Sequence, residues 1–161
     1  MSGIESVVAK GMCMSCGACS AAGYELKPFK KTGMIYPVST GKSNKEMALN
    51  VCPGKGYDIG GMTQDPKDGM KIASFELGQY LSIGAVRSSD PVLLKNASSG
   101  GVMTAFSKFL LDAGIVSGII TTRMGYSSIE GPRPEPFIAS NISELMLGQG
   151  SKYCPVPLLA I

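Results

Sequence analysis

The sequence predicts an α+β fold in two parts, and three observations lead to this prediction. The first part is short and carries three cysteines at intervals of three residues. A polar stretch rich in glycine and proline, residues 60–69, then interrupts the pattern. Beyond it, strand and helix signals alternate as in an α/β domain. We therefore expect one domain over residues 1–66 and a second over residues 67–161, which suits a chain of 161 residues.

Composition and charge exclude several classes of protein. A hydrophobic content of 44% is enough for a packed core, and a formal net charge of +3 is too small to indicate nucleic acid as a partner. No basic leader is present and no apolar run reaches the ~18 residues of a membrane span, so we expect a cytoplasmic protein. The sequence contains no histidine, which excludes His-based triads, His zinc sites and haem held by a proximal histidine.

The first domain is organised around Cys13, Cys16 and Cys19, in the pattern C-x2-C-x2-C. Bacterial ferredoxins continue with C-x3-C-P, which would place a cysteine at position 23, where Gly23 stands instead. Cys52, which a proline follows, is the expected fourth ligand. We therefore predict one 4Fe-4S cluster on these four cysteines. Structural zinc is the alternative, although zinc sites usually pair two separated C-x2-C knuckles.

The remaining elements of the first domain are short. Apolar residues within 4–8 indicate one helical turn, and residues 24–29 and 33–38 read as the strands of a small hairpin over the cluster. Residues 43–51 predict one or two helical turns that deliver Cys52.

The second domain begins with a predicted strand over residues 80–86. A helix follows from residue 98 to residue 113, where apolar residues recur at spacings of three and four. Residues 116–122 read as the next strand, and the continuous Ile119-Ile120 pair indicates that it is buried. Together these elements predict a β-α-β unit.

The end of the chain carries weaker signals. Residues 124–136 contain three prolines and predict a surface loop, and residues 137–139 form a short strand candidate. Asn141 and Glu144 have the spacing of a capping box, which predicts a brief helix to Leu147.

Two glycine-containing turns are candidate ligand sites. In the first, Ser98-Ser99-Gly100-Gly101, the hydroxyls and the N–H groups of a helix start suit a phosphate, while an ordinary N-cap is the alternative. In the second, Lys152 has the charge to pair with a phosphate or a flavin carbonyl, and Tyr153 has a ring to stack. A solvated lysine beside a half-buried tyrosine is the alternative there. Cys154 has no nearby partner, and we expect it to be buried and inert.

The order and spacing of these motifs resemble a known family. The quoted features are the four cysteines, the stretch Ala97-Ser98-Ser99-Gly100-Gly101-Val102 with Thr104, the strand Gly118-Ile119-Ile120, and Gly150-Ser151-Lys152-Tyr153. The chain resembles, over nearly its whole length, the beta subunits of coenzyme F420-reducing hydrogenases and formate dehydrogenases, of which it would be the N-terminal part. The resemblance implies an iron-sulfur flavoprotein in which FAD exchanges a hydride with a deazaflavin or related cofactor. Single electrons then pass through the cluster to a partner subunit.

The sequence therefore predicts a small ferredoxin-like iron-sulfur domain followed by a truncated α/β flavin-binding domain. Coenzyme F420 is the expected substrate, and a hydrogenase or dehydrogenase subunit or a ferredoxin is the expected partner in a hetero-oligomer. We expect the FAD phosphates near Ser98, Ser99, Gly100, Gly101 and Thr104, and the flavin ring near Ser151, Lys152 and Tyr153. The alternative is a non-catalytic, ferredoxin-like electron carrier or docking subunit.

Overall fold

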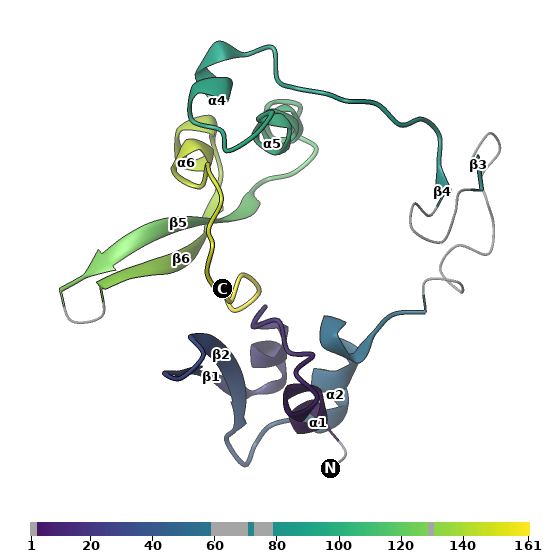
Figure 1. Cartoon of the computed structure of the whole chain (residues 1–161), viewed down its shortest axis with the longest axis vertical. Helices are drawn as coiled ribbons and strands as arrows, with labels where there is room; N and C mark the ends of the chain where they lie inside the picture. The colour runs from purple at the N-terminus through teal and green to yellow at the C-terminus, as the bar shows by residue number, and fades with distance from the viewer. Residues whose placement is uncertain (1–2, 59–70, 73–78, 129–130) are drawn as a thin grey trace. The chain divides into compact units, whose positions relative to one another are not determined.

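The computed structural model describes residues 3–58, 71–72, 79–128 and 131–161 (Figure 1). The chain divides into two compact units, one formed by Met1–Lys55 with Arg87–Ile161 and the other by Gly56–Val86. The helices and strands follow one another in the order α1 (Ile4–Ala9), β1 (Tyr24–Phe29), β2 (Met34–Ser39), α2 (Lys45–Asn50), β3 (Lys71–Ile72), β4 (Gln79–Tyr80), α4 (Pro91–Lys95), α5 (Val102–Asp112), β5 (Ile119–Ser127), β6 (Gly131–Ala139) and α6 (Ile142–Leu147).

The N-terminal elements match the predicted hairpin and helical turns. Strands β1 and β2 pair antiparallel, with Tyr24 opposite Ser39 and Phe29 opposite Met34. Helix α2 forms because the Asn44 side chain accepts a hydrogen bond from the Met47 N–H at 3.0 Å, as an N-cap does. A small core joins these elements; its buried members are Ile4, Val7, Cys19, Ala22, Tyr24 and Ala48.

The C-terminal elements are built around a long hairpin rather than a β-α-β unit. Strands β5 and β6 pair antiparallel from Ile119 opposite Ala139 to Ser127 opposite Gly131. Helix α6 packs against this hairpin and against α5, as Figure 1 shows. Every strand pairing within the described residues is antiparallel. The α+β class therefore holds, and the parallel arrangement predicted for the second domain is wrong.

Three further expectations about this region are wrong. The strand predicted over residues 80–86 is confined to β4, after which residues 81–90 are irregular. The loop predicted over residues 124–136 lies largely in β5 and β6. Ile120, expected to be buried, is 47% exposed. The predicted boundary at residues 60–69 lies outside the described residues.

The three prolines of β6 are the reason that this segment was predicted as a loop. They occupy alternate positions, 132, 134 and 136, so all the missing N–H groups fall on the same edge of the strand. A two-stranded hairpin leaves one edge of each strand without a ladder partner, and proline is tolerated there.

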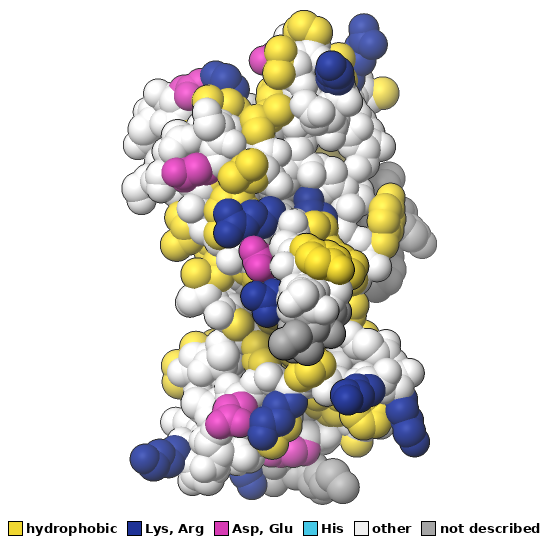
Figure 2. Space-filling view, turned by 90° about the vertical axis from the view of Figure 1, so that its left-hand side faces the viewer, with side chains coloured by type: hydrophobic (Ala, Val, Ile, Leu, Met, Phe, Trp, Pro, Cys, Tyr) yellow, Lys and Arg dark blue, Asp and Glu magenta, His cyan; other side chains and the backbone are white. Residues whose placement is uncertain are grey.

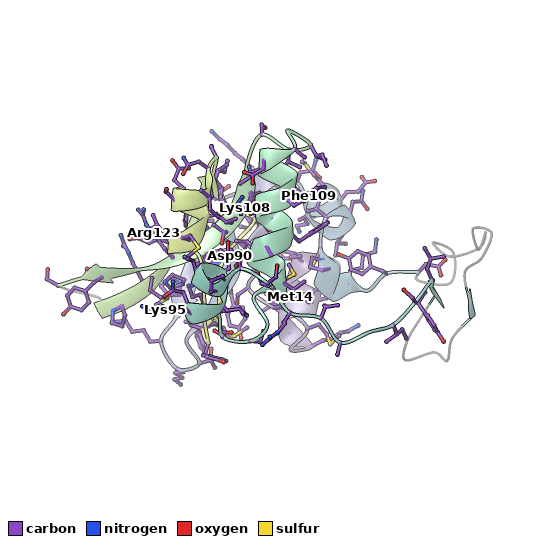
Figure 3. All side chains as sticks on the ribbon, turned by 90° about the horizontal axis from the view of Figure 1, so that it is seen from above. Met14, Asp90, Lys95, Lys108, Phe109 and Arg123 are labelled. Carbon is purple, nitrogen blue, oxygen red and sulfur yellow. The ribbon has the colours of Figure 1, made fainter. Side chains whose placement is uncertain are left out.

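Helix α5 begins and ends where glycines allow left-handed backbone. Gly101 (φ 69°) precedes its first residue and Gly114 (φ 64°) follows its last turn. No residue of α5 is buried, and Phe106 and Phe109 are 56% and 58% exposed. Figure 3 marks Phe109 on this helix. The two-stranded hairpin and α6 are too small to cover its apolar side.

The surface is mixed in character. On the face shown in Figure 2, lysine and arginine side chains lie among acidic and hydrophobic ones. Within the described residues, no helix has the length and apolar character needed to cross a membrane.

Candidate functional site

The loop that carries Cys13, Cys16 and Cys19 is shaped by two residues with left-handed backbone. Ser15 has φ 57° and Gly17 has φ 87°, a region that glycine enters freely and serine does not. The Ser15 hydroxyl is buried and accepts a hydrogen bond from the Ile35 N–H at 3.0 Å, which attaches the loop to β2. The strained serine conformation is therefore held by the hairpin behind it.

Cys52 reaches the same loop from the end of α2. A Cβ atom on Gly54 would lie 2.4 Å from the Met12 carbonyl oxygen, so the Cys-Pro-Gly turn approaches the loop as closely as its backbone allows. One cavity of about 20 Å³ is lined by Cys13, Cys16, Cys19 and Cys52, together with apolar side chains that include Ile4, Leu26, Ile35 and Pro37. The structure thus brings together all four cysteines predicted as ligands.

Burial controls the protonation of two of these thiols. It raises the pKa of Cys19 to about 11, with smaller contributions from Cys16, Cys13 and Cys52. Burial also raises the pKa of Cys13, where the neighbouring Cys52 and Cys16 act in the same direction and a backbone hydrogen bond from Ser15 opposes them. Both thiols therefore carry protons near neutral pH, and binding of a metal centre would release them.

The four thiols line one small cavity. In the part of the chain that the structure describes, no three Cys, Asp or Glu side chains are close enough to hold a single metal ion. The cavity volume is close to that of one water molecule, so a cluster would have to widen it.

The two glycine-containing turns predicted as a ligand site meet in space. The Ser98 Oγ accepts a hydrogen bond from the Ser151 N–H at 2.7 Å. The Ser88 N–H donates to the Gly100 carbonyl at 2.7 Å, which fixes the turn before α5. Ser99 is exposed, and Thr104 lies half-buried in the first turn of α5.

Lys152 and Tyr153, predicted near the flavin ring, have different surroundings. The Lys152 ammonium donates to three loop carbonyls, those of Gly148, Gln149 and Gly150, at 2.9–3.0 Å. The Tyr153 ring is 95% exposed. Cys154 is exposed, so the expectation that it is buried is wrong; it lies in an irregular segment, outside any helix or strand.

Arg123 and Gln149 were missed by the sequence reasoning. They line a second cavity of about 420 Å³ with Met124, Leu147, Ser151 and Lys152. Figure 3 labels Arg123. Its guanidinium pairs with Glu135 at 3.2 Å and lies 5.4 Å from the centre of the Phe137 ring. Gln149 lies between Gly148 and Gly150, in the second of the two turns predicted as ligand sites, so the sequence pointed to its position. No motif in the sequence marked Arg123.

Comparison with known proteins bears on the second half of the chain. A family model described as "Coenzyme F420 hydrogenase/dehydrogenase, beta subunit N-term" matches residues 83–161. The predicted resemblance to this beta-subunit family is confirmed. The matched residues include the turn at residues 98–101 and the turn at residues 150–153. It does not reach the cysteine loop, so the similarity to the family model is narrower than the nearly whole length expected.

Curated relatives show the same resemblance. The chain is 36% identical over 77 residues to coenzyme F420 hydrogenase subunit beta of Methanothermobacter thermautotrophicus, and 30% identical over 84 residues to that of Methanosarcina barkeri. It is 33% identical over 69 residues to F420-dependent formate dehydrogenase 1 subunit beta of Methanococcus maripaludis. These matches cover 48%, 52% and 43% of this chain but only 26%, 28% and 17% of the relatives.

Proposed function

We propose that this protein is an electron-transfer flavoprotein subunit of an oxidoreductase. A 4Fe-4S cluster would be held by Cys13, Cys16, Cys19 and Cys52, and FAD by the turns around Ser98 and Ser151. Reduced coenzyme F420 or a related hydride carrier would be the donor, and a hydrogenase or dehydrogenase subunit or a ferredoxin the acceptor. The relatives are named as a coenzyme F420 hydrogenase subunit and an F420-dependent formate dehydrogenase subunit, which supports coenzyme F420 as the hydride carrier and oxidoreduction as the class of reaction.

The convergence of four cysteines on one cavity carries this proposal. Two separate segments deliver thiols to a mostly apolar space, and thiolates are the ligands of iron-sulfur clusters.

The second site offers groups that suit a flavin nucleotide. The first turn of α5 presents backbone N–H groups toward the Ser98–Gly101 turn, a favourable place for phosphate. The cavity beside Ser151 has the volume of a small-molecule site, and polar groups of Arg123, Gln149, Ser151 and Lys152 line it together with Met124 and Leu147. A bound flavin would accept a hydride as two electrons and release them singly to a cluster, so the absence of histidine is no obstacle.

The test is the cofactor content of the purified protein after anaerobic reconstitution with iron, sulfide and FAD. We expect a flavin absorption spectrum that bleaches on addition of reduced coenzyme F420, and iron close to four atoms per chain, the count in a 4Fe-4S cluster. Cys52→Ser should lose the intact cluster and Cys154→Ser should keep it. Equal iron content in these two variants would overturn the ligand assignment, and bound zinc in place of iron would overturn the cluster.

One observation favours a second candidate, a carrier or docking subunit without flavin. The Lys152 ammonium is held by loop carbonyls and the Tyr153 ring faces solvent, so two side chains expected at the flavin are not directed at a shared ligand. Reconstitution separates the candidates, because a carrier takes up iron and sulfide and leaves FAD in solution.

A further inference from the structure

We propose that an acidic redox protein docks on a methionine surface, formed by Lys10, Met12, Met14 and Lys55 beside the thiol cavity, and exchanges single electrons with the cysteine site. The proposal deepens the proposed function and rests on it, since it assigns a docking surface and a charge to the electron-transfer partner. One electron at a time passes between the two proteins, and no covalent bond forms or breaks.

Two exposed methionines flank Cys13 in the cysteine loop. Met12 is 56% exposed and Met14 is 58% exposed. Met14, labelled in Figure 3, also lines the cavity that the four cysteines share. Methionine is unbranched and polarisable, and proteins use it at surfaces that adapt to a partner. A protein that covers these two side chains therefore comes next to the predicted ligand Cys13.

Two lysines border these methionines. Lys10 follows the last residue of α1, and the Met12 N–H donates to the Val7 carbonyl at 3.0 Å, so the chain turns back directly after Lys10. Lys55 follows Gly54, where an added Cβ atom would overlap the Met12 carbonyl oxygen. Both lysines are exposed, and neither has an ion-pair partner within the described residues. The methionine surface therefore has two unpaired positive charges at its edge.

Charge is unevenly distributed along the chain. Residues 1–58 contain seven basic and four acidic residues, whereas residues 59–161 contain eight of each, so the whole net charge of +3 lies in the first stretch. Two of those four acidic side chains have partners, since Glu5 accepts from the Tyr24 hydroxyl at 3.3 Å and Glu25 pairs with Lys27 at 3.1 Å. The segment that carries the predicted cluster ligands therefore attracts an anionic protein.

The small size and the charge of the methionine surface favour a transient, acidic partner. Electron-transfer complexes have small interfaces, and opposite charges steer the two proteins together. A loaded 4Fe-4S site is itself anionic, because four thiolates outweigh the charge of the core, so an acidic partner depends on the lysines beside it. A second copy of this chain would instead place lysines against lysines.

The experiment measures how charge and salt control the binding of two probe proteins to the reconstituted holoprotein. The probes are an acidic two-cluster ferredoxin and basic cytochrome c, each titrated in the oxidised state by calorimetry at about 20 mM and about 200 mM salt. We expect the ferredoxin to bind about tenfold more weakly at the higher salt concentration, and cytochrome c not to bind.

Paired charge variants test where the ferredoxin docks. Lys10→Gln combined with Lys55→Gln should weaken ferredoxin binding about tenfold at low salt. Lys42→Gln combined with Lys45→Gln removes the same charge and should leave the affinity within about twofold of wild type. This control pair is suitable because Lys45 lies at the other end of α1, where an added Cβ atom on Gly3 would be 3.7 Å from the Lys45 Cδ.

A methionine variant tests the apolar part of the contact. Met12→Gln keeps the length of the side chain and should weaken ferredoxin binding about threefold at both salt concentrations, with unchanged iron content. Equal affinities of the two lysine double variants, or unchanged binding by Met12→Gln, would overturn the docking surface.

Three other results separate this proposal from the proposed function. Loaded protein that does not bind the ferredoxin, that prefers cytochrome c, or that dimerises through the methionine surface would overturn the docking proposal while the proposed function stands. Failure of the wild-type protein to take up iron overturns the proposed function itself.

Discussion

The Ser98 hydroxyl oxygen accepts a hydrogen bond from the backbone N–H of Ser151 at 2.7 Å. This bond joins the turn before α5 to the turn after α6, across 53 residues of sequence. Gly150, next to Ser151, has left-handed backbone with φ 86° and packs close to this bond, since a Cβ atom there would lie 3.7 Å from the Ser98 Oγ. Two motifs that the sequence marks separately are thereby parts of one structure.

Replacing Ser98 with alanine should loosen both turns. The variant loses an acceptor at the surface, where water can hydrate the freed N–H, so we expect a loss of about 1 kcal/mol in the free energy of unfolding. Flavin affinity should fall in parallel. Ser143→Ala is the matched control, because that side chain is exposed, lies outside both turns and makes no hydrogen bond within the described residues. Urea unfolding and FAD titration measure both effects, and equal behaviour of the two variants would show that the bond between the turns contributes little.

Lys152 should act as a clamp on its own loop. Its ammonium donates to the carbonyls of Gly148, Gln149 and Gly150, and hydrogen bonds with a charged partner stabilise by about 1.5–3 kcal/mol. Lys152→Met should therefore destabilise the loop by an amount near the low end of that range, since the side chain is only half-buried.

Hydrogen exchange of the loop amides would detect this effect locally. Lys95→Met is the control, because Lys95 is exposed at the end of α4. A strong dependence of FAD affinity on salt in wild type, absent in Lys152→Met and accompanied by unchanged exchange, would instead assign the ammonium to a ligand phosphate.

Local signals in the sequence predicted most of the helix ends. Asn44 and Asn141 accept hydrogen bonds from backbone N–H groups three residues on, and Gly114 ends α5 in a left-handed conformation. These features depend on residues within one turn of each other, so a short stretch of sequence determines them. The convergence of Cys52 on the loop of Cys13 was predictable for a different reason, since the thiol spacing left one ligand to be supplied.

Features set by distant parts of the chain were not predictable in this way. The pairing of β5 with β6 depends on which edge the prolines of β6 present, and the sequence pattern suggested a loop. The exposure of Phe106 and Phe109 depends on what covers α5, which helical periodicity cannot reveal. Gln149 acquires its free oxygen only because Leu93, 56 residues earlier in the sequence, occupies its nitrogen.

Because α5 is exposed, a substitution in α5 should cost less free energy of unfolding than one at a buried position in α6. Phe106→Gln should change the free energy of unfolding by no more than about 0.5 kcal/mol, because the ring is more than half exposed. Leu145→Ala in α6 removes a buried side chain and should cost about 2–5 kcal/mol. Thermal or urea unfolding of both variants measures the contrast. A cost for Phe106→Gln comparable to that of Leu145→Ala would mean that α5 is covered in solution.

Glu135 should make the β5–β6 hairpin sensitive to acid. Hydrogen bonds from Arg123 and Arg133 hold the pKa of this carboxyl below its usual value, with the bond from Arg123 the largest cause. A lowered pKa means that the stabilisation is present above the unfolded pKa, near 4.5, and is lost as pH falls through the folded value.

Glu135→Gln should therefore lower the melting temperature at pH 7 and leave it unchanged at pH 2.5. The difference should be small, because the side chain is 30% exposed and solvent screens the pair. A deficit that persists unchanged at pH 2.5 would attribute the effect to packing and not to charge.

Alanine variants of Gly17 and Gly33 test whether residues 157–160 help to shape the cysteine loop. Gly17 has φ 87°, and a Cβ atom there would lie 2.9 Å from the Ala160 Cβ and 3.2 Å from the Pro157 carbonyl oxygen. The Leu159 N–H donates to the Cys16 carbonyl at 2.8 Å, so a methyl group at position 17 would also displace this bond.

Gly33 in the β1–β2 turn has φ 69° with nothing within 4 Å of an added Cβ, so Gly33→Ala isolates the backbone penalty of about 1 kcal/mol. Gly17→Ala should lose more stability than that, and its reconstituted iron content should fall because the cysteines on either side shift with the loop. Gly33→Ala should keep its iron. If both variants lose the same stability and keep the same iron, the contact between residues 157–160 and the loop has no part in shaping the thiol site.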